Sequence, residues 1–170
     1  MRRLFLTIGV LCFAAPACAE WVHTTEDDPF TDSPVQLSAA IDTSGYFGGV
    51  RCTTAADLAL VFVTVEEVGN DGAADLLAAL PVKVLVIVDD APKVELDAKV
   101  EPTPDGKKYR VIAQGDDKLT GLLKATLAAK KRFAISQEIL GKRYHTHSFN
   151  ARGSSKALEK LVAACGIKFD

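Results

Sequence analysis

The sequence predicts an α+β domain: a mostly antiparallel β-sheet or sandwich with two helices, the second at the C-terminal end. Most apolar segments are short, alternate with polar residues or are rich in β-branched residues, and are separated by turn residues, as strands are. Two later segments repeat apolar residues at helical spacing. Strands and helices do not alternate regularly, which argues against a parallel, doubly wound sheet.

The first half of the domain is predicted to consist of strands and turns. A short extended segment covers residues 21–24, and proline and Asx residues indicate a turn before residue 35. The segments that alternate or are rich in Val, Leu and Phe predict strands at 35–41, 50–53, 58–65 and 82–88. Residues 73–80 fit either a helical turn or a loop, which Pro81 ends.

Residues 93–114 carry the clearest hairpin pattern of the chain. Apolar side chains alternate along each predicted strand and would share one face of the sheet, because successive strand residues point to opposite faces. Pro104-Asp105-Gly106 provides the turn between the strands. The alternating residues are Val94, Leu96, Ala98 and Val100 on the first strand, and Tyr109, Val111 and Ala113 on the second.

Two helices and a second hairpin complete the prediction. The leucines of 119–127 predict a helix that begins at Asp116 or Asp117 and ends near Lys130, with its lysines at the C-terminal end. Strands at 132–140 and 143–150 would be joined at Gly141. The last helix is predicted from the Ser154-Ser155 cap to Cys165. Its buried stripe would contain Leu158, Leu161, Val162 and Cys165, with Gly166 after its end.

The first 19 residues have the three parts of an export signal. Arg2-Arg3 forms a basic start, residues 4–15 an apolar core that is short for a membrane anchor, and Ala17-Cys18-Ala19 the small residues of a cleavage site. We therefore expect residues 1–19 to be a signal peptide. Residues 20–170 would then form a single globular domain in the periplasm, not inserted in the membrane.

Two alternatives to export by the ordinary secretory route, followed by release as a soluble protein, stay open. Arg2-Arg3 also occurs in twin-arginine signals, although the very short basic start favours the ordinary secretory route. Cys18 lies where a lipoprotein would be cleaved and lipidated, although the usual large aliphatic residue before it is absent. Secretion beyond the periplasm is a further possibility that the signal leaves open.

Cys52 and Cys165 are the two cysteines that remain after cleavage of the signal. Two cysteines in an exported chain usually pair, and these do not form the C-x-x-C motif of redox proteins. We therefore predict a structural disulfide that ties the C-terminal helix to the strand of Cys52.

The charge of the chain excludes a nucleic-acid partner. The chain has 20 basic and 22 acidic residues, and removal of Arg2 and Arg3 changes the net charge from −2 to about −4. A nucleic-acid surface requires a basic stripe, and the one basic cluster, at 130–132, fits a solvated helix end better.

No motif predicts catalysis or a cofactor. Gly153-Ser154-Ser155-Lys156 is not the G-x-S-x-G elbow of a hydrolase, and paired acids such as Asp89-Asp90 would point to opposite faces of a strand. His145 and His147 are weak metal candidates, because on a strand both imidazoles would face one side about 7 Å apart. His23 would have to add a third ligand. The competing interpretation is a solvated strand face.

The order of features resembles the VasI-like family, small exported accessory proteins associated with bacterial type VI secretion. The match spans most of the mature chain, and its most specific parts are an early Arg-Cys strand and a final F-x-x-R-G…A-L…L…C pattern. It rests on Trp21, Asp32-Ser33, Val35, Leu37-Ser38, Val50-Arg51-Cys52, the 119–127 helix with Lys131-Arg132-Phe133, Phe149 to Gly153, Ala157-Leu158, Leu161 and Cys165. The resemblance implies a non-catalytic periplasmic domain.

These observations predict an exported, soluble, non-enzymatic binding or accessory protein that acts through a protein surface. Its partner would be a periplasmic or envelope protein. Phe30, Tyr46 and Phe47 are the candidate contact residues, because large apolar side chains in turns need a reason to be exposed. Packing over the sheet edge is the competing explanation. The alternative functions are an inhibitor of an envelope enzyme, a hydrolase assembled across loops, or a weak metal-binding protein.

Overall fold

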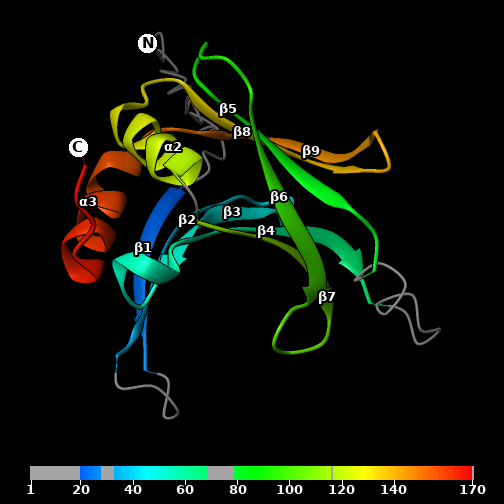
Figure 1. Ribbon diagram of the computed structural model, residues 1–170, viewed down its shortest axis with the longest axis horizontal. Helices are drawn as coiled ribbons and strands as arrows, with labels where there is room; N and C mark the ends of the chain where they lie inside the picture. The colour runs from blue at the N-terminus through cyan, green and yellow to red at the C-terminus, as the bar shows by residue number, and fades with distance from the viewer. Residues whose placement is uncertain (1–19, 28–32, 69–78, 116, 170) are drawn as a thin grey trace, which may run out of the picture.

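Antiparallel strands form a curled sheet that crosses the whole molecule (Figure 1). The computed structural model describes residues 20–27, 33–68, 79–115 and 117–169. Within these residues the sheet has nine strands in the order β1-β2-β3-β4-β7-β6-β5-β8-β9, and every neighbouring pair is antiparallel. The predicted α+β class, with an antiparallel sheet and two helices, is confirmed.

The bounds of the elements follow the sequence patterns closely. The strands are β1 (Glu20–Glu26), β2 (Val35–Ile41), β3 (Phe47–Cys52), β4 (Ala59–Glu67), β5 (Val82–Val88), β6 (Val94–Pro102), β7 (Lys108–Gln114), β8 (Arg132–Ile139) and β9 (Lys142–Asn150). The helices are α2 (Asp117–Ala128) and α3 (Ser154–Cys165), with a short 3-10 turn η1 (Ala55–Asp57). The segment predicted as a brief extended entry is a full edge strand, β1. Residues 73–78, the predicted signal peptide (residues 1–19) and Phe30 lie outside the described residues.

The sheet curls because β6 changes partner along its length. Residues 94–98 of β6 pair with β5, and residues 99–102 pair with β7. Figure 1 shows β6 as the long strand that joins the β5-β8-β9 part of the sheet to the β1-β2-β3-β4-β7 part. A strand shared between two sheet regions is how orthogonally packed sheets turn a corner. The inner faces of the two regions therefore face each other.

Both helices lie at one side of the curl and share its core (Figure 1). Helix α3 packs on β1 and β2, and α2 packs on α3, β5 and β6. Of the residues predicted for the helical stripes, Leu127 and Val162 are half-buried. The others are buried: Leu119, Leu122, Leu123, Leu158, Leu161 and Cys165. Packing of these stripes, rather than intrinsic propensity, is what stabilises helices of this length.

The helices are also fixed by polar contacts and by one covalent bond. Cys52 on β3 is bonded to Cys165 on α3, with the two Cα atoms 6.3 Å apart, so the predicted disulfide is confirmed. Ser154 was expected to cap α3, but the N-cap is Gly153. The Ser154 hydroxyl instead donates to the Thr126 carbonyl of α2 at 3.0 Å, because the side chain is fully buried between the helices.

Trp21 closes the sheet against β9. Its Nε1 donates to the Asn150 carbonyl at 2.9 Å, and its ring meets Phe133 edge-on at 5.5 Å. β1 and β9 are the two ends of the strand order. This contact therefore holds the two ends of the curled sheet together.

Within the described residues, no helix is long and apolar enough to cross a membrane.

Candidate functional site

Tyr46 and Phe47, the two described residues predicted to contact a partner, lie on opposite faces of the sheet. Tyr46 points into the curl, where its ring stacks on Phe62 at 5.9 Å and on His147 at 4.5 Å. Phe47 is the first residue of β3 and is directed to the outer face, where it packs against a small separate cluster. Of the two, only Phe47 is therefore available to a partner approaching from outside the curl.

The outer patch is an apolar area on the outer face of three neighbouring strands, β3, β4 and β7. We define it as Ala59, Phe47, Val61, Val63 and Ile112. Phe47 lies opposite Val63 and Val61 lies opposite Ile112, so these side chains are cross-strand neighbours. The cluster is distinct from the main core, whose residues on the same strands point the other way.

A cleft of about 450 Å³ lies beside the outer patch and adds charged side chains to it. Phe47, Val61 and Val63 line it together with Arg51 and Arg110. Arg110 pairs with Glu101 at 2.8 Å, while Arg51 has no ion pair with any residue that the structure describes. Glu26 and Asp27 also line the cleft, so the site combines an apolar floor with charges of both signs.

The histidines of β9 lie inside the curl, each beside a different carboxylate. His145 has φ of 51° next to the point where the β8–β9 register shifts, so a bulge directs its ring inward. Its Nε2 lies 3.3 Å from Glu66 Oε1. His147 Nε2 lies in contact with Asp42 Oδ2, without the alignment of a hydrogen bond. The acids come from β4 and from the β2–β3 turn.

Asp42 is held in its charged form by its neighbours. Burial opposes ionisation of this carboxyl, but hydrogen bonds from Ser44, together with the closeness of the His147 ring, outweigh that effect and lower the pKa of Asp42 below its usual value. The Ser44 hydroxyl donates to Asp42 Oδ1 at 2.6 Å. Asp42 is thus a fixed negative charge facing β9.

The structure does not bring His23 into a group with the other two histidines. His23 lies on β1, where its Nδ1 is 2.9 Å from Ser38 Oγ, and burial followed by the charge of Lys160 lowers its pKa. Among the described residues, no group of three or more His, Cys, Asp or Glu side chains could hold a metal ion. Each of His145 and His147 therefore contacts one carboxylate, that of Glu66 and that of Asp42 respectively.

His23 and Ser38 do not have the arrangement of a base and a nucleophile. The Ser38 hydroxyl donates to the Ala157 carbonyl at 2.8 Å, so its proton is directed at α3 and not at the imidazole. Ser38 is also fully buried, which keeps a substrate away from its oxygen. The pair is a structural contact that joins β1, β2 and α3.

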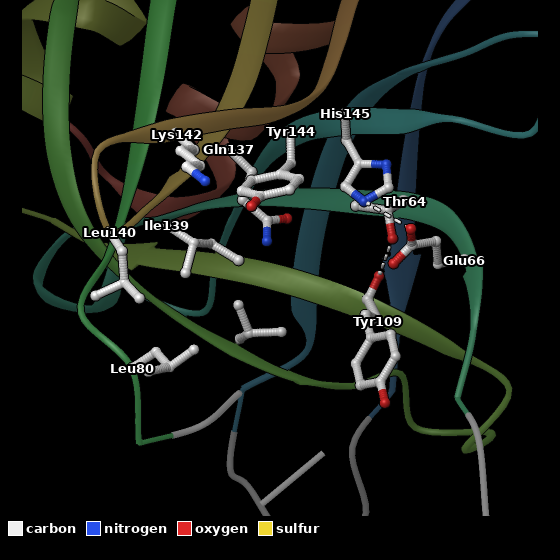
Figure 2. A pocket seen from close by; sticks show the side chains of 11 residues that line it. Thr64, Glu66, Leu80, Tyr109, Gln137, Ile139, Leu140, Lys142, Tyr144 and His145 are labelled. Carbon is white, nitrogen blue, oxygen red and sulfur yellow. Dashed lines mark hydrogen bonds and ion pairs between the residues drawn. The ribbon is translucent and has the colours of Figure 1, made fainter. Parts of the chain in front are cut away.

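A second cavity, of about 400 Å³, opens on the inner side of the curl between β4, β7 and the β8–β9 hairpin. Figure 2 shows Leu80, Ile139 and Leu140 on one side of it, and Glu66 with His145 on the other. Sequence reasoning missed this cavity, because its walls come from segments far apart in the chain and no local motif marks it.

No protein-family model and no curated protein matches this chain. Among solved structures, the chain is similar to invasion associated protein B from Bartonella henselae. The TM-score is 0.36 and the sequence identity 17%, over 83% of this chain and 82% of that one. A TM-score of this size does not establish a common fold. The resemblance to the VasI-like family stays a prediction.

Proposed function

We propose that this chain is an exported, soluble, non-catalytic accessory protein of the bacterial envelope, and that it binds a partner protein through the outer patch. The export pattern of residues 1–19 supports the location, as does the Cys52–Cys165 disulfide, because such bonds persist in oxidising compartments. The resemblance to the VasI-like family makes a component of an envelope secretion system the expected partner.

Phe47 is the observation that carries the binding proposal. It is half-buried on the outer face, beside Val61 and Val63, and the cleft next to it is lined by two arginines. Aromatic and arginine side chains grouped on one surface are the residues that most often dominate protein interfaces. A fitting partner places an apolar side chain over the outer patch and a carboxylate near Arg51.

Cross-linked capture of the exported protein from its own cells tests this proposal. A photo-reactive amino acid in place of Val63 is expected to cross-link an envelope protein, and Phe47→Ser is expected to abolish the cross-link while the fold is kept. Leu140→Asn is the matched control, because Leu140 is an exposed apolar residue that lines the inner cavity and is not part of the outer patch. It should leave capture unchanged.

Three outcomes would contradict the proposal. Recovery of the protein without any cross-linked protein would contradict the binding of a partner. Equal loss of capture in Phe47→Ser and Leu140→Asn would remove the outer patch as the binding surface. Capture of one enzyme whose activity the protein blocks would replace the accessory function with that of an inhibitor.

A further inference from the structure

The second cavity, on the inner side of the curl, is called the inner cavity here. Leu140 is the most exposed residue at its apolar end. Leu140 occupies the turn between β8 and β9 with φ of 50°, and its side chain is 68% exposed. Asn, Asp and Gly are preferred at such turn positions, because a larger side chain is strained there. Both the backbone strain at this position and the exposure of its apolar side chain lower the stability of the fold, so folding alone does not explain a leucine here.

Leu140 lies on the same side of the cavity as other apolar side chains. Leu80 and Ile139 are half-buried, and Val100 is buried at the base. Figure 2 shows Leu80, Ile139 and Leu140 gathered at one side of the opening. An apolar body that enters here would cover all three and remove the exposed surface of Leu140 from water, which is favourable in proportion to the area covered.

The cavity also has hydrogen-bond donors that the protein does not use. The Lys142 ammonium has no ion pair with any described residue, and the side-chain amide of Gln137 makes no hydrogen bond within the same residues. The Tyr109 hydroxyl is buried in the cavity wall without a partner. Gln137 and Tyr109 are buried, where polar groups are normally satisfied, whereas Lys142 is exposed.

The cavity has one cationic side chain that is not paired. Among the described residues that line it, Glu66 is the one acidic residue and lies 3.3 Å from His145, whereas Lys142 has no ion pair. Lys142 is therefore the charge that a ligand could match. Its donors fit a carboxylate, whose two oxygens accept hydrogen bonds.

We propose that this cavity binds a small amphipathic carboxylate, with its apolar chain against Leu80, Ile139 and Leu140 and its carboxylate at Lys142 and Gln137. The volume of about 400 Å³ lies within the range of small-molecule sites, about 300–1,000 Å³. The site is separate from the outer patch, and the proposal does not depend on the partner protein.

Calorimetric titration of the purified protein, as it is recovered after export, with decanoate tests the site. Decanol and decylamine, which have the same chain length, are the comparison ligands. We expect saturable binding of one decanoate per chain and much weaker binding of the other two. Lys142→Met should weaken decanoate binding about tenfold, because a charged hydrogen bond is lost. Lys93→Met is the control, since Lys93 does not line this cavity, and it should bind as the parent protein does.

Leu140→Asn separates a binding role from a structural one. Asn is better suited to the positive φ of this turn, so the variant should keep or raise the melting temperature. It should nevertheless bind decanoate several-fold more weakly. Equal binding of decanoate and decylamine, absence of saturable binding, or equal effects of Lys142→Met and Lys93→Met would each overturn the proposal.

Discussion

Gly48 on β3 lies directly against the ring of Phe149 on β9. A Cβ atom added to Gly48 would come within 2.7 Å of Phe149 Cε2, closer than real Cβ contacts allow. Phe149 is 1% exposed and cannot move aside without disturbing the core. The missing side chain of Gly48 therefore allows β9, at one end of the sheet, to pack against β3.

Gly48→Ala should destabilise the fold by about 1–3 kcal/mol, the usual range for overpacking a core. The measurement is urea unfolding followed by the fluorescence of Trp21, the single tryptophan of the chain. Gly121→Ala is the matched control, because its added Cβ meets nothing within 4 Å on α2. That variant should gain up to about 1 kcal/mol from helix propensity. Equal stability of Gly48→Ala and the parent would show that β9 does not pack as described.

The local elements of this fold were predictable from the sequence because each has its own periodicity. The alternation in β6 and β7 and the leucine spacing of α2 and α3 require no knowledge of distant residues. The disulfide was predictable because only two cysteines remain beyond residue 19. Each of these predictions depends either on residues close together in the sequence or on a residue type that occurs only a few times in the chain.

The arrangement inside the curl could not be predicted in the same way. His147 meets Asp42 and His145 meets Glu66 only because β6 turns the sheet back on itself. No pattern within either segment marks the other, since the strand order is set by packing of the whole chain. The opposite directions of Tyr46 and Phe47 follow from strand alternation, but which face is covered depends on where the helices and β9 lie.

Removal of the disulfide by the double variant Cys52→Ser/Cys165→Ser should lower stability by up to about 4–5 kcal/mol. The bond closes a loop with a sequence separation of 113, and the chain-entropy model gives this magnitude for such a length. Urea unfolding of the parent with and without reductant should reproduce the difference. A variant as stable as the oxidised parent would mean that α3 is held by packing alone.

His23 should make the protein less stable as the pH falls below about 6.5. Burial and then Lys160 lower the pKa of His23 in the folded state, so the unfolded chain binds the proton more readily. This contribution is complete above the unfolded pKa and is lost as the pH falls toward the lowered, folded pKa. NMR titration of the imidazole should show that lowered value, and Lys160→Met should raise it. A pKa of His23 unchanged by Lys160→Met would contradict the assignment.

Asp89 should contribute more to stability than its neighbour Asp90. Asp89 accepts hydrogen bonds from the backbone N–H groups of Lys130, Lys131 and Arg132, which ties the β5–β6 turn to the start of β8. These bonds lower the pKa of Asp89. Its contribution is therefore present above the ordinary aspartate pKa of about 3.9 and is lost as the pH falls through the lowered value.

Asp89→Asn should lower the melting temperature at pH 7, because the variant loses the charge and one of its two acceptor oxygens. Asp90→Asn is the matched control. Asp90 pairs only with the exposed Lys131 ammonium among the described residues, and surface ion pairs of this kind contribute little. The difference between the two variants should shrink as the pH falls below the ordinary aspartate pKa and through the lowered pKa of Asp89, because the parent carboxylate then becomes protonated. Equal melting temperatures at pH 7 would mean that the three N–H groups find water instead, and that this turn does not fix the position of β8.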